Sequence, residues 1–439
     1  MTTEPFPAAA AAVGVEPPPV ARTNFLLLLL LSLTIALGWT LLGLFSPVQE
    51  AAKADMGLTD DQMGLLQGAA VAVPLALLSI PFGRMTDRGR RVRLLAGLGV
   101  AWTVGVIGSA FAPEFWSLFV CRVLIGAGAV LCVPVAISIG ADLSSIATRG
   151  RSMFVLGVGK TIGQAAAFAV GAAAFTWAQS EGFLGLAPWR ATHLVVGIAG
   201  AVLLLPLLFL KEPARAETAS GGDHSLRAAL SEIWKRRAFL LPLYAAYVAV
   251  IMADVAAAVW AAPILQRSFN QQPADFGGWM GAVILGAGIF GALAGGVAAD
   301  VGQKVRWRGG LMLAALVAAV VGVPAATFAI MPDVALFGAL LGLLLFAGAV
   351  MGLVTATALA LVIPNEIRGI CLAVLLLVGG VVGFGFGPSV VTVVSRALGG
   401  EAQLPMAVTL VGVVASAVSV LAFAVATFNT PARNAPAAR

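Results

Sequence analysis

The sequence Gly83-Arg-Met-Thr-Asp-Arg-Gly-Arg-Arg91 is a short charged segment between two apolar stretches, at about 61–83 and 93–112. Each stretch has the roughly 20 apolar residues that a helix needs to cross a hydrocarbon core of about 30 Å. Such stretches recur along the 439 residues, of which 60% are hydrophobic and 10% are charged, with a mean hydropathy of +1.00. This composition argues against most soluble enzyme folds, and the unbroken apolar runs argue against a transmembrane barrel. The sequence therefore predicts an all-α polytopic membrane protein.

Twelve apolar windows of helical length predict the domain organisation. They lie at about 24–46, 61–83, 93–112, 114–140, 152–177 and 189–210, and then at 238–266, 277–299, 309–331, 334–363, 368–395 and 404–428. We expect a disordered cytoplasmic tail at 1–23, a six-helix bundle at 24–210, a cytoplasmic linker at 211–237, a second six-helix bundle at 238–428 and a cytoplasmic tail at 429–439.

The distribution of basic residues predicts the orientation. If both termini are cytoplasmic, the external segments carry only Lys53, Arg190, Arg267 and Arg396, and nearly all other Lys and Arg residues lie inside. Cytoplasmic loops of membrane proteins are enriched in these residues, so the net charge of +6 reflects topology and no nucleic acid is expected as a partner. We expect a multi-pass protein of a cell membrane, with short loops that fit a bacterial inner membrane.

The opening segment has a second copy. Gly296-Val-Ala-Ala-Asp-Val-Gly-Gln-Lys304 aligns with Gly83 to Arg91 at an offset of 213, so that Asp300 corresponds to Asp87. Two related halves are a common way to build transporters of this size.

These motifs resemble those of the major facilitator superfamily. The segment from Gly83 to Arg91 is similar to that superfamily's loop signature after its second helix, and Arg122-Val-Leu-Ile-Gly-Ala-Gly128 resembles its R-x-x-x-G-x-G pattern. The resemblance implies twelve helices in two six-helix pseudo-repeats that rock around a central site. It implies secondary transport by alternating access, and no enzymatic activity.

A finer resemblance involves the segment before and within the second window. Leu58-Thr-Asp-Asp-Gln-Met-Gly-Leu-Leu-Gln-Gly68 is similar to the Spinster-like branch and to the related organic anion symporters. Spinster-like proteins usually carry an acid just after R-x-x-x-G-x-G, where this chain has Ala129. The resemblance therefore places no proton-carrying acid at that position.

A set of residues near the charged loops is expected to act as a conformational gate. Its glycines permit tight turns, and its acids and arginines can bridge the halves. The set contains Gly83, Asp87, Arg88, Gly89, Arg91, Asp142 and Asp300. The alternative is that these basic residues only anchor the loop to anionic headgroups.

Two cations fall inside the predicted spans of the N-terminal half. Arg122 and Lys160 both lie about 12 Å from a membrane surface, and Gln164 lies on the same helical face as Lys160. Charges at this depth are costly and usually functional, so we expect the two cations to bind an anionic substrate. The alternatives are that Arg122 bonds backbone carbonyls of neighbouring helices and that Lys160 stays neutral among carbonyls.

One acid lies well inside a span of the C-terminal half. Asp254 shares a helical face with Tyr244 and Tyr247, the only two tyrosines of the chain. We expect the tyrosines to bind substrate and Asp254 to exchange a proton, although ordinary packing would explain tyrosines at these positions as well. Trp39, on a stripe of small residues in the first window, is a further substrate-binding candidate.

The sequence thus predicts a secondary transporter of a small organic anion, with proton coupling. It is expected to be a monomer that has lipid, substrate and protons as partners and needs no cofactor or metal. Two alternatives stay open: a Spinster-like carrier or exporter of lipid-like amphiphiles, and a membrane sensor or scaffold that transports nothing.

Overall fold

The computed structural model describes residues 24–145, 148–215, 226–305, 307, 309–363 and 365–430. Within these ranges the chain is helical apart from short turns and one isolated bridge between Phe183 and Leu186. Twelve helical segments in this part of the chain are long and apolar enough to cross a membrane, which confirms the predicted fold class. The predicted N-terminal tail, most of the predicted C-terminal tail and linker residues 216–225 lie outside the described residues.

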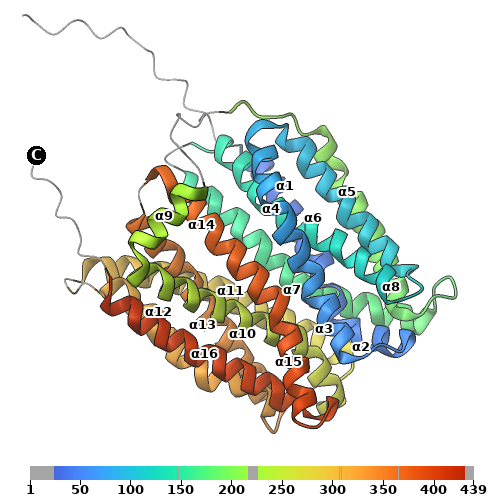
Figure 1. The fold of residues 1–439 in the computed structure, drawn as a ribbon. Helices are drawn as coiled ribbons and strands as arrows, with labels where there is room; N and C mark the ends of the chain where they lie inside the picture. Colours follow the sequence, from blue (N-terminus) through green and yellow to red (C-terminus); the bar gives the residue numbers. More distant parts are fainter. Residues whose placement is uncertain are drawn as a thin grey trace, which may run out of the picture.

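The first six spans form the N-terminal half (Figure 1). They consist of α1 (Phe25–Gly43) with α2 (Phe45–Met56), α3 (Asp60–Gln67) with α4 (Ala69–Arg88), α5 (Arg91–Ala110), α6 (Phe115–Asp142), α7 (Arg149–Glu181), and α8 (Pro188–Leu204) with η1 (Leu205–Phe209).

The short helix α9 (Leu226–Lys235) precedes the six spans of the C-terminal half. These consist of α10 (Arg237–Phe269), α11 (Pro273–Lys304), α12 (Gly310–Ala325) with η2 (Ala326–Ile330), α13 (Val334–Val362), α14 (Asn365–Gly379) with the π-helical turn η3 (Gly380–Phe384) and α15 (Gly385–Ala397), and η4 (Glu401–Gln403) with α16 (Leu404–Phe428).

Local sequence explains where several helices begin and break. The Asn24 side chain accepts a hydrogen bond from the Leu27 amide at the start of α1, and Thr59 and Gln62 form a capping box at the start of α3. The break at Gly68 lies against the C-terminal half, where a Cβ would fall 2.7 Å from the Phe384 carbonyl oxygen. Only glycine permits this approach of the two backbones.

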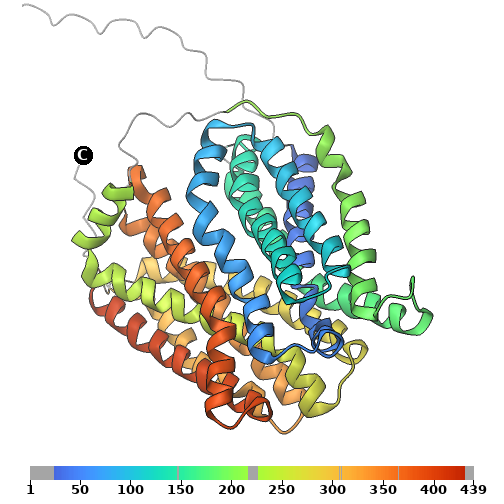
Figure 2. The same cartoon turned by 45° about the vertical axis from the view of Figure 1, so that its right-hand side comes forward.

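The halves meet at one end of the bundle and separate toward the other. We call the end where α1 begins and α16 ends the termini end, and the opposite end the far end. An apolar core at the far end combines both halves and includes Phe45 and Leu66 with Trp260 and Val391. Two further large cores are each built of buried residues from one half. The ribbons accordingly converge at the far end and diverge toward the termini end (Figures 1 and 2).

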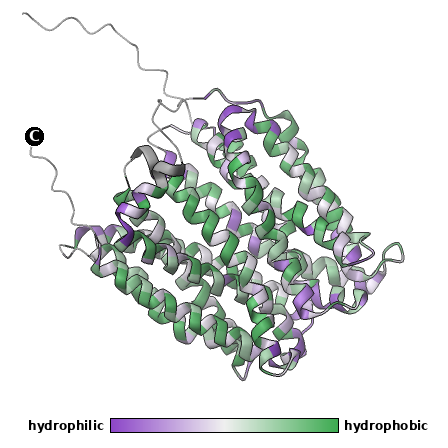
Figure 3. Cartoon of the chain, in the orientation of Figure 1, coloured by the Kyte–Doolittle hydropathy of each residue, from purple (hydrophilic) through white to green (hydrophobic). Residues whose placement is uncertain are grey.

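Hydrophilic residues gather mainly at the two ends of the helices, with few between them (Figure 3). A polar side chain between the ends lies in the apolar part of the membrane, where its burial is energetically costly. Such a side chain therefore needs a polar partner or a functional role.

Candidate functional site

A cavity of about 500 Å³ lies between the two halves, and we call it the central cavity. Its wall is formed by α1, α2, α3, α4, α6 and α7 of the N-terminal half and by α10, α11, α13 and η3 of the C-terminal half. Most of the lining is apolar. The polar lining includes all but one of the side chains that the sequence assigns to substrate or proton binding, namely Trp39, Arg122, Lys160, Gln164, Tyr247 and Asp254.

The exception is Tyr244. It is buried, and its hydroxyl donates a hydrogen bond of 2.7 Å to the Cys371 carbonyl oxygen, which ties α10 to α14. Tyr247 lies on the same helical face, but it is nearer the membrane centre and lines the cavity. The spacing predicted that the two tyrosines share a face. It could not predict where along α10 the cavity ends and the apolar core begins.

Lys160 enters the central cavity from α7. Its Nζ lies 4.5 Å from the centroid of the Trp39 ring, and the side chain is exposed within the cavity. It makes no hydrogen bond or ion pair with any described residue. An ammonium on an indole face gains from the ring quadrupole yet keeps its three N–H donors for another partner. Trp39 is itself buried, and its Nε1 has no hydrogen-bond partner in the described structure.

Asp254 faces the same cavity from α10, in the opposite half. Its carboxylate packs against Gly348 of α13, where a Cβ would fall 2.6 Å from Oδ1. Asp254 and Lys160 interact electrostatically across the cavity without forming an ion pair within the described structure. A carboxylate and an ammonium thus face one cavity from opposite halves.

Arg122 lines the cavity but its donors are already engaged. It is fully buried, and Nη1 donates to the Leu42 carbonyl at 2.9 Å, Nε to the Leu66 carbonyl at 3.2 Å and Nη2 to Gln67 Oε1 at 2.7 Å. These acceptors lie beside the α1–α2 and α3–α4 breaks, where carbonyls lose their helical partners. Its guanidinium also lies 5.0 Å from the Phe45 ring centroid. Arg122 thus holds two interrupted spans together.

A line of hydrogen bonds continues from Arg122 into the other half. Gln67 Nε2 donates to Gln49 Oε1 at 3.2 Å, and Gln49 Nε2 donates to the Val259 carbonyl of α10 at 2.7 Å. Both glutamines are buried. The sequence analysis did not single them out, although an amide inside or beside an apolar window was the signal that could have found them.

Charged residues join the halves at the far end, in what we call the far-end cluster. It contains Glu50, Lys53, Asp60 and Asp61 of the N-terminal half, and Arg267, Arg396 and Glu401 of the C-terminal half.

Arg267 is the centre of this cluster. Its Nη2 lies 2.7 Å from both a Glu50 oxygen and an Asp60 oxygen, and its Nε and Nη1 donate to the same two carboxylates. Lys53 pairs with Asp60 at 2.7 Å and also with Glu401. The cluster ties the two halves together at the far end.

From the sequence, the basic members of this cluster indicate only the topology. Its acids fall in or next to predicted loops, where a charge needs no explanation. The first span also runs to Met56, about ten residues past its predicted end, because the polar face of α2 is satisfied by the cluster.

Part of the predicted gate forms a cluster within the N-terminal half at the termini end. Arg91 is buried, pairs with Asp142, and pairs with Glu212 at 3.1 Å. It also donates to the Ser138 and Pro213 carbonyls at 3.1 Å each. The structure thus brings together Arg91 and Asp142, as expected, and adds Glu212 from the segment after η1.

The other predicted gate residues are placed without a contact across the halves. Asp87, Arg88 and Asp300 are exposed at helix ends, and space is open around Gly83. At Gly89 a Cβ would fall 2.6 Å from the Met85 carbonyl oxygen, so the helix end requires glycine. The loop is held by Arg215, which donates to the Thr86 and Gly89 carbonyls at 2.9 Å and to the Asp87 carbonyl. Within the described part of the chain, Asp87, Arg88 and Asp300 make no ion pair with the opposite half, and their role in a gate stays a prediction.

Comparisons with known proteins agree with this architecture. Human protein spinster homolog 1 is 28% identical over 221 residues, which are 48% of this chain and 39% of the human protein. The chain thus aligns with less than half of that relative's length. A probable 4-methylmuconolactone transporter of Cupriavidus pinatubonensis is 26% identical over 357 residues, or 79% of each chain.

A solved structure has the same fold over nearly its full length. The crystal structure of a bacterial homolog of the human lysosomal transporter Spinster, in an inward-facing and unoccupied conformation, has a TM-score of 0.77 at 22% identity, covering 95% of this chain and 100% of that one. The family model of the Major Facilitator Superfamily matches residues 28–388. Twelve spans, a cavity between two halves and this match lead to one conclusion: the chain is a multi-pass membrane protein that belongs to the Major Facilitator Superfamily.

Proposed function

We propose that the protein carries a small organic anion by alternating access, with Lys160 binding the anionic group and Asp254 exchanging a proton. The observation that supports this most directly is the Lys160 ammonium, which lies on Trp39 in the central cavity and makes no hydrogen bond or ion pair with a described residue. A charge inside a span is usually retained for a ligand or a counter-ion.

The apolar lining suggests the kind of anion. A ligand here would place one carboxylate at Lys160 and the Trp39 Nε1, and its body against the apolar wall that includes Phe168 and Phe384. If Asp254 is protonated when the anion binds, the anion is paired with Lys160 and no carboxylate charge in the cavity repels it, which favours symport of an acid with a proton. The relative from Cupriavidus is a probable 4-methylmuconolactone transporter, which makes small organic acids the first compounds to test.

Arg122 has a supporting role in this proposal. Because its guanidinium is engaged by Leu42, Leu66 and Gln67, it shapes the cavity and adds positive potential, while Lys160 makes the direct contact. Gln164 and Tyr247 line the same cavity and supply further hydrogen-bonding groups.

The orientation is part of the proposal. With both termini cytoplasmic, the structure corresponds to a state open to the cytoplasm and sealed outside by the far-end cluster. In the opposite state, Asp87, Arg88 and Asp300 would come together across the halves at the cytoplasmic end.

The test is uptake by purified protein in liposomes. We expect an imposed inward proton gradient to accelerate uptake of benzoate or 4-methylmuconolactone into proteoliposomes, and expect Lys160→Met to abolish this uptake. Uptake that is unchanged in Lys160→Met would overturn the assignment of the anion site.

A second candidate, favoured by the apolar lining and by the Spinster relatives, is transport of a lipid-like amphiphile. Inhibition of uptake by lysophospholipid, together with lysophospholipid transport that does not respond to the proton gradient, would support it over the first.

A further inference from the structure

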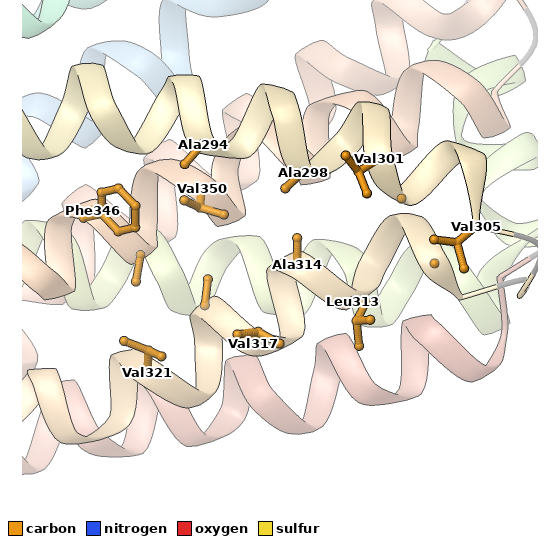
Figure 4. Close-up of a pocket in the computed structure, with 14 residues that line it drawn as sticks. Ala294, Ala298, Val301, Val305, Leu313, Ala314, Val317, Val321, Phe346 and Val350 are labelled. Atoms are coloured by element: carbon orange, nitrogen blue, oxygen red, sulfur yellow. The ribbon is translucent and has the colours of Figure 1, made fainter.

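A second cavity opens on the outer surface of the C-terminal half, away from the central cavity. This groove of about 440 Å³ lies between α11 and α12, and its floor is formed by Phe346, Ala347 and Val350 of α13 (Figure 4). The residues that line it are glycine, alanine, valine, leucine and phenylalanine. Val301 and Val317 on its rim are 54% and 56% exposed, so the groove faces the surroundings of the bundle.

The shape of the groove follows from a close crossing of two helices. A Cβ at Gly302 would fall 2.6 Å from the Gly310 carbonyl oxygen, so α11 and α12 touch near the termini end. Away from this crossing, alanines on both helices leave space between them (Figure 4). From Gly310 to Val321 the groove extends for about 16 Å at 1.5 Å per residue, which is about half of a hydrocarbon core of roughly 30 Å. The groove therefore has the length of one leaflet.

The termini end of the groove carries groups typical of a membrane interface. Lys304, in the last turn of α11, is exposed, and Trp307 is 49% exposed. Lysine and tryptophan at this level contact headgroups, and a lysine attracts anionic ones. An apolar groove that begins at such an interface and ends near the membrane centre is suited to bind a lipid chain and not water.

We propose that this groove binds one acyl chain of a phospholipid from the leaflet at the termini end, with an anionic headgroup beside Lys304. An unfilled slot of this size would cost its walls their dispersion contacts. α11 and α12 form the two sides of the slot and α13 closes its floor, so we expect a single chain, which enters from the open lipid-facing side.

The bound chain would support a wall of the central cavity. In α13, Ala347 and Val350 line the groove, whereas Gly348 and Ala349 between them line the central cavity. A chain in the groove therefore packs on the side of α13 opposite to the contact between Gly348 and Asp254. Binding of the chain does not depend on what the central cavity transports.

The experiment is photo-labelling of the full-length protein in nanodiscs of phosphatidylcholine that contain a phosphatidylglycerol with a diazirine near the end of one acyl chain. Peptide mapping should find the label on Phe346 to Val350 and on the facing side of α12. Ala314→Phe should abolish labelling of the groove. Val320→Phe is the matched control, because Val320 is 53% exposed on the same helix and does not line the groove. Lys304→Ala should lower labelling by about fivefold, as expected for one lysine near an anionic headgroup.

Equal labelling in wild type, Ala314→Phe and Val320→Phe would overturn the proposal. If Ala314→Phe does not fold, Ala298→Leu fills the same groove from α11 and serves as the second variant. A second copy of the chain could occupy the groove instead. To test this, the Val317→Cys variant is oxidised in the membrane, and a dimer linked by a disulfide at residue 317 would also overturn the proposal. We expect Lys160→Met to abolish uptake and to leave the labelling of the groove unchanged. The two proposals can therefore fail independently of each other.

Discussion

The Asp254 carboxylate of α10 lies directly against the Cα of Gly348 in α13, with no space for a methyl group between them. The carboxylate therefore owes its place in the central cavity to a glycine on another helix. How far the carboxylate reaches into the cavity depends on how closely α10 and α13 pack.

We expect Gly348→Ala to displace Asp254 and to reduce proton-driven uptake severely. Overpacking of this kind costs about 1–3 kcal/mol, so the variant should still fold in detergent. Gly352→Ala is the control, because Gly352 also lines the cavity one turn along α13 and no atom lies within 4 Å of the added Cβ. Uptake into proteoliposomes measures the effect on transport, and the unfolding temperature shows whether each variant is folded. Equal uptake by the two variants would mean that the position of Asp254 is not critical.

Lys160→Met should weaken binding of the transported anion by about ten- to a hundredfold, since a hydrogen bond to a charged group contributes about 1.5–3 kcal/mol. Stabilisation of the purified protein by added benzoate provides the measurement. Lys211→Ala removes an exposed cation outside the cavity and should change nothing. A similar loss of stabilisation in both variants would point to a general effect of net charge.

Arg122→Lys should lower the free energy of unfolding by about 2–3 kcal/mol, because a lysine cannot serve the three acceptors that the guanidinium joins, and buried acceptors without a donor are costly. The positive charge is kept. If Arg122 is mainly a structural tie, the unfolding temperature falls while the benzoate affinity of the folded fraction stays close to that of wild type. The opposite pattern would make Arg122 a direct ligand of the anion.

Arg267→Ala should shift the protein toward states that are open at the far end, since it removes the pairs with Glu50 and Asp60 that join the halves, a loss of about 1–2 kcal/mol. Distances between spin labels at Ala54 and Ala402, on opposite sides of the far end, should gain a longer component.

Arg190→Ala is the matched control for that experiment. Arg190 pairs with Asp55 at 3.0 Å at the same end, but both residues belong to the N-terminal half. A distance distribution that widens equally in the two variants would show that any lost charge loosens this end.

The sequence was sufficient to predict the twelve spans, because each apolar window is long enough to stand out alone. It also identified the cations and the acid of the central cavity, since a charge such as Lys160 inside a window is conspicuous. The same reasoning left open whether Arg122 binds a substrate or carbonyls of neighbouring helices, and it could not tell that the carbonyls would be those of Leu42 and Leu66. Those carbonyls are free only because α1 and α3 end there, and helix breaks inside apolar windows leave little signal.

The far-end cluster was missed for a related reason. Asp60 and Arg267 are more than 200 positions apart, and each looks like an ordinary loop charge until the halves are brought together. The gate at the termini end was predicted from motifs and remains a prediction for the opposite state. Of its members, Arg91 and Asp142 form the expected pair, but within one half and together with Glu212, whose part the sequence did not indicate.

The hydrogen-bonded line from Arg122 through Gln67 and Gln49 to the Val259 carbonyl has a consequence for the speed of transport. When the halves part at the far end, the hydrogen bond between the Gln49 amide and the Val259 carbonyl breaks in a region without water. Water must then enter to form hydrogen bonds with both groups. The opening movement is then also a hydration step, so its rate should depend on the activity of water. The test is the turnover rate in concentrated sucrose. A rate that falls by more than the viscosity explains would support this hydration step, and a rate that does not change with osmolyte concentration would exclude it.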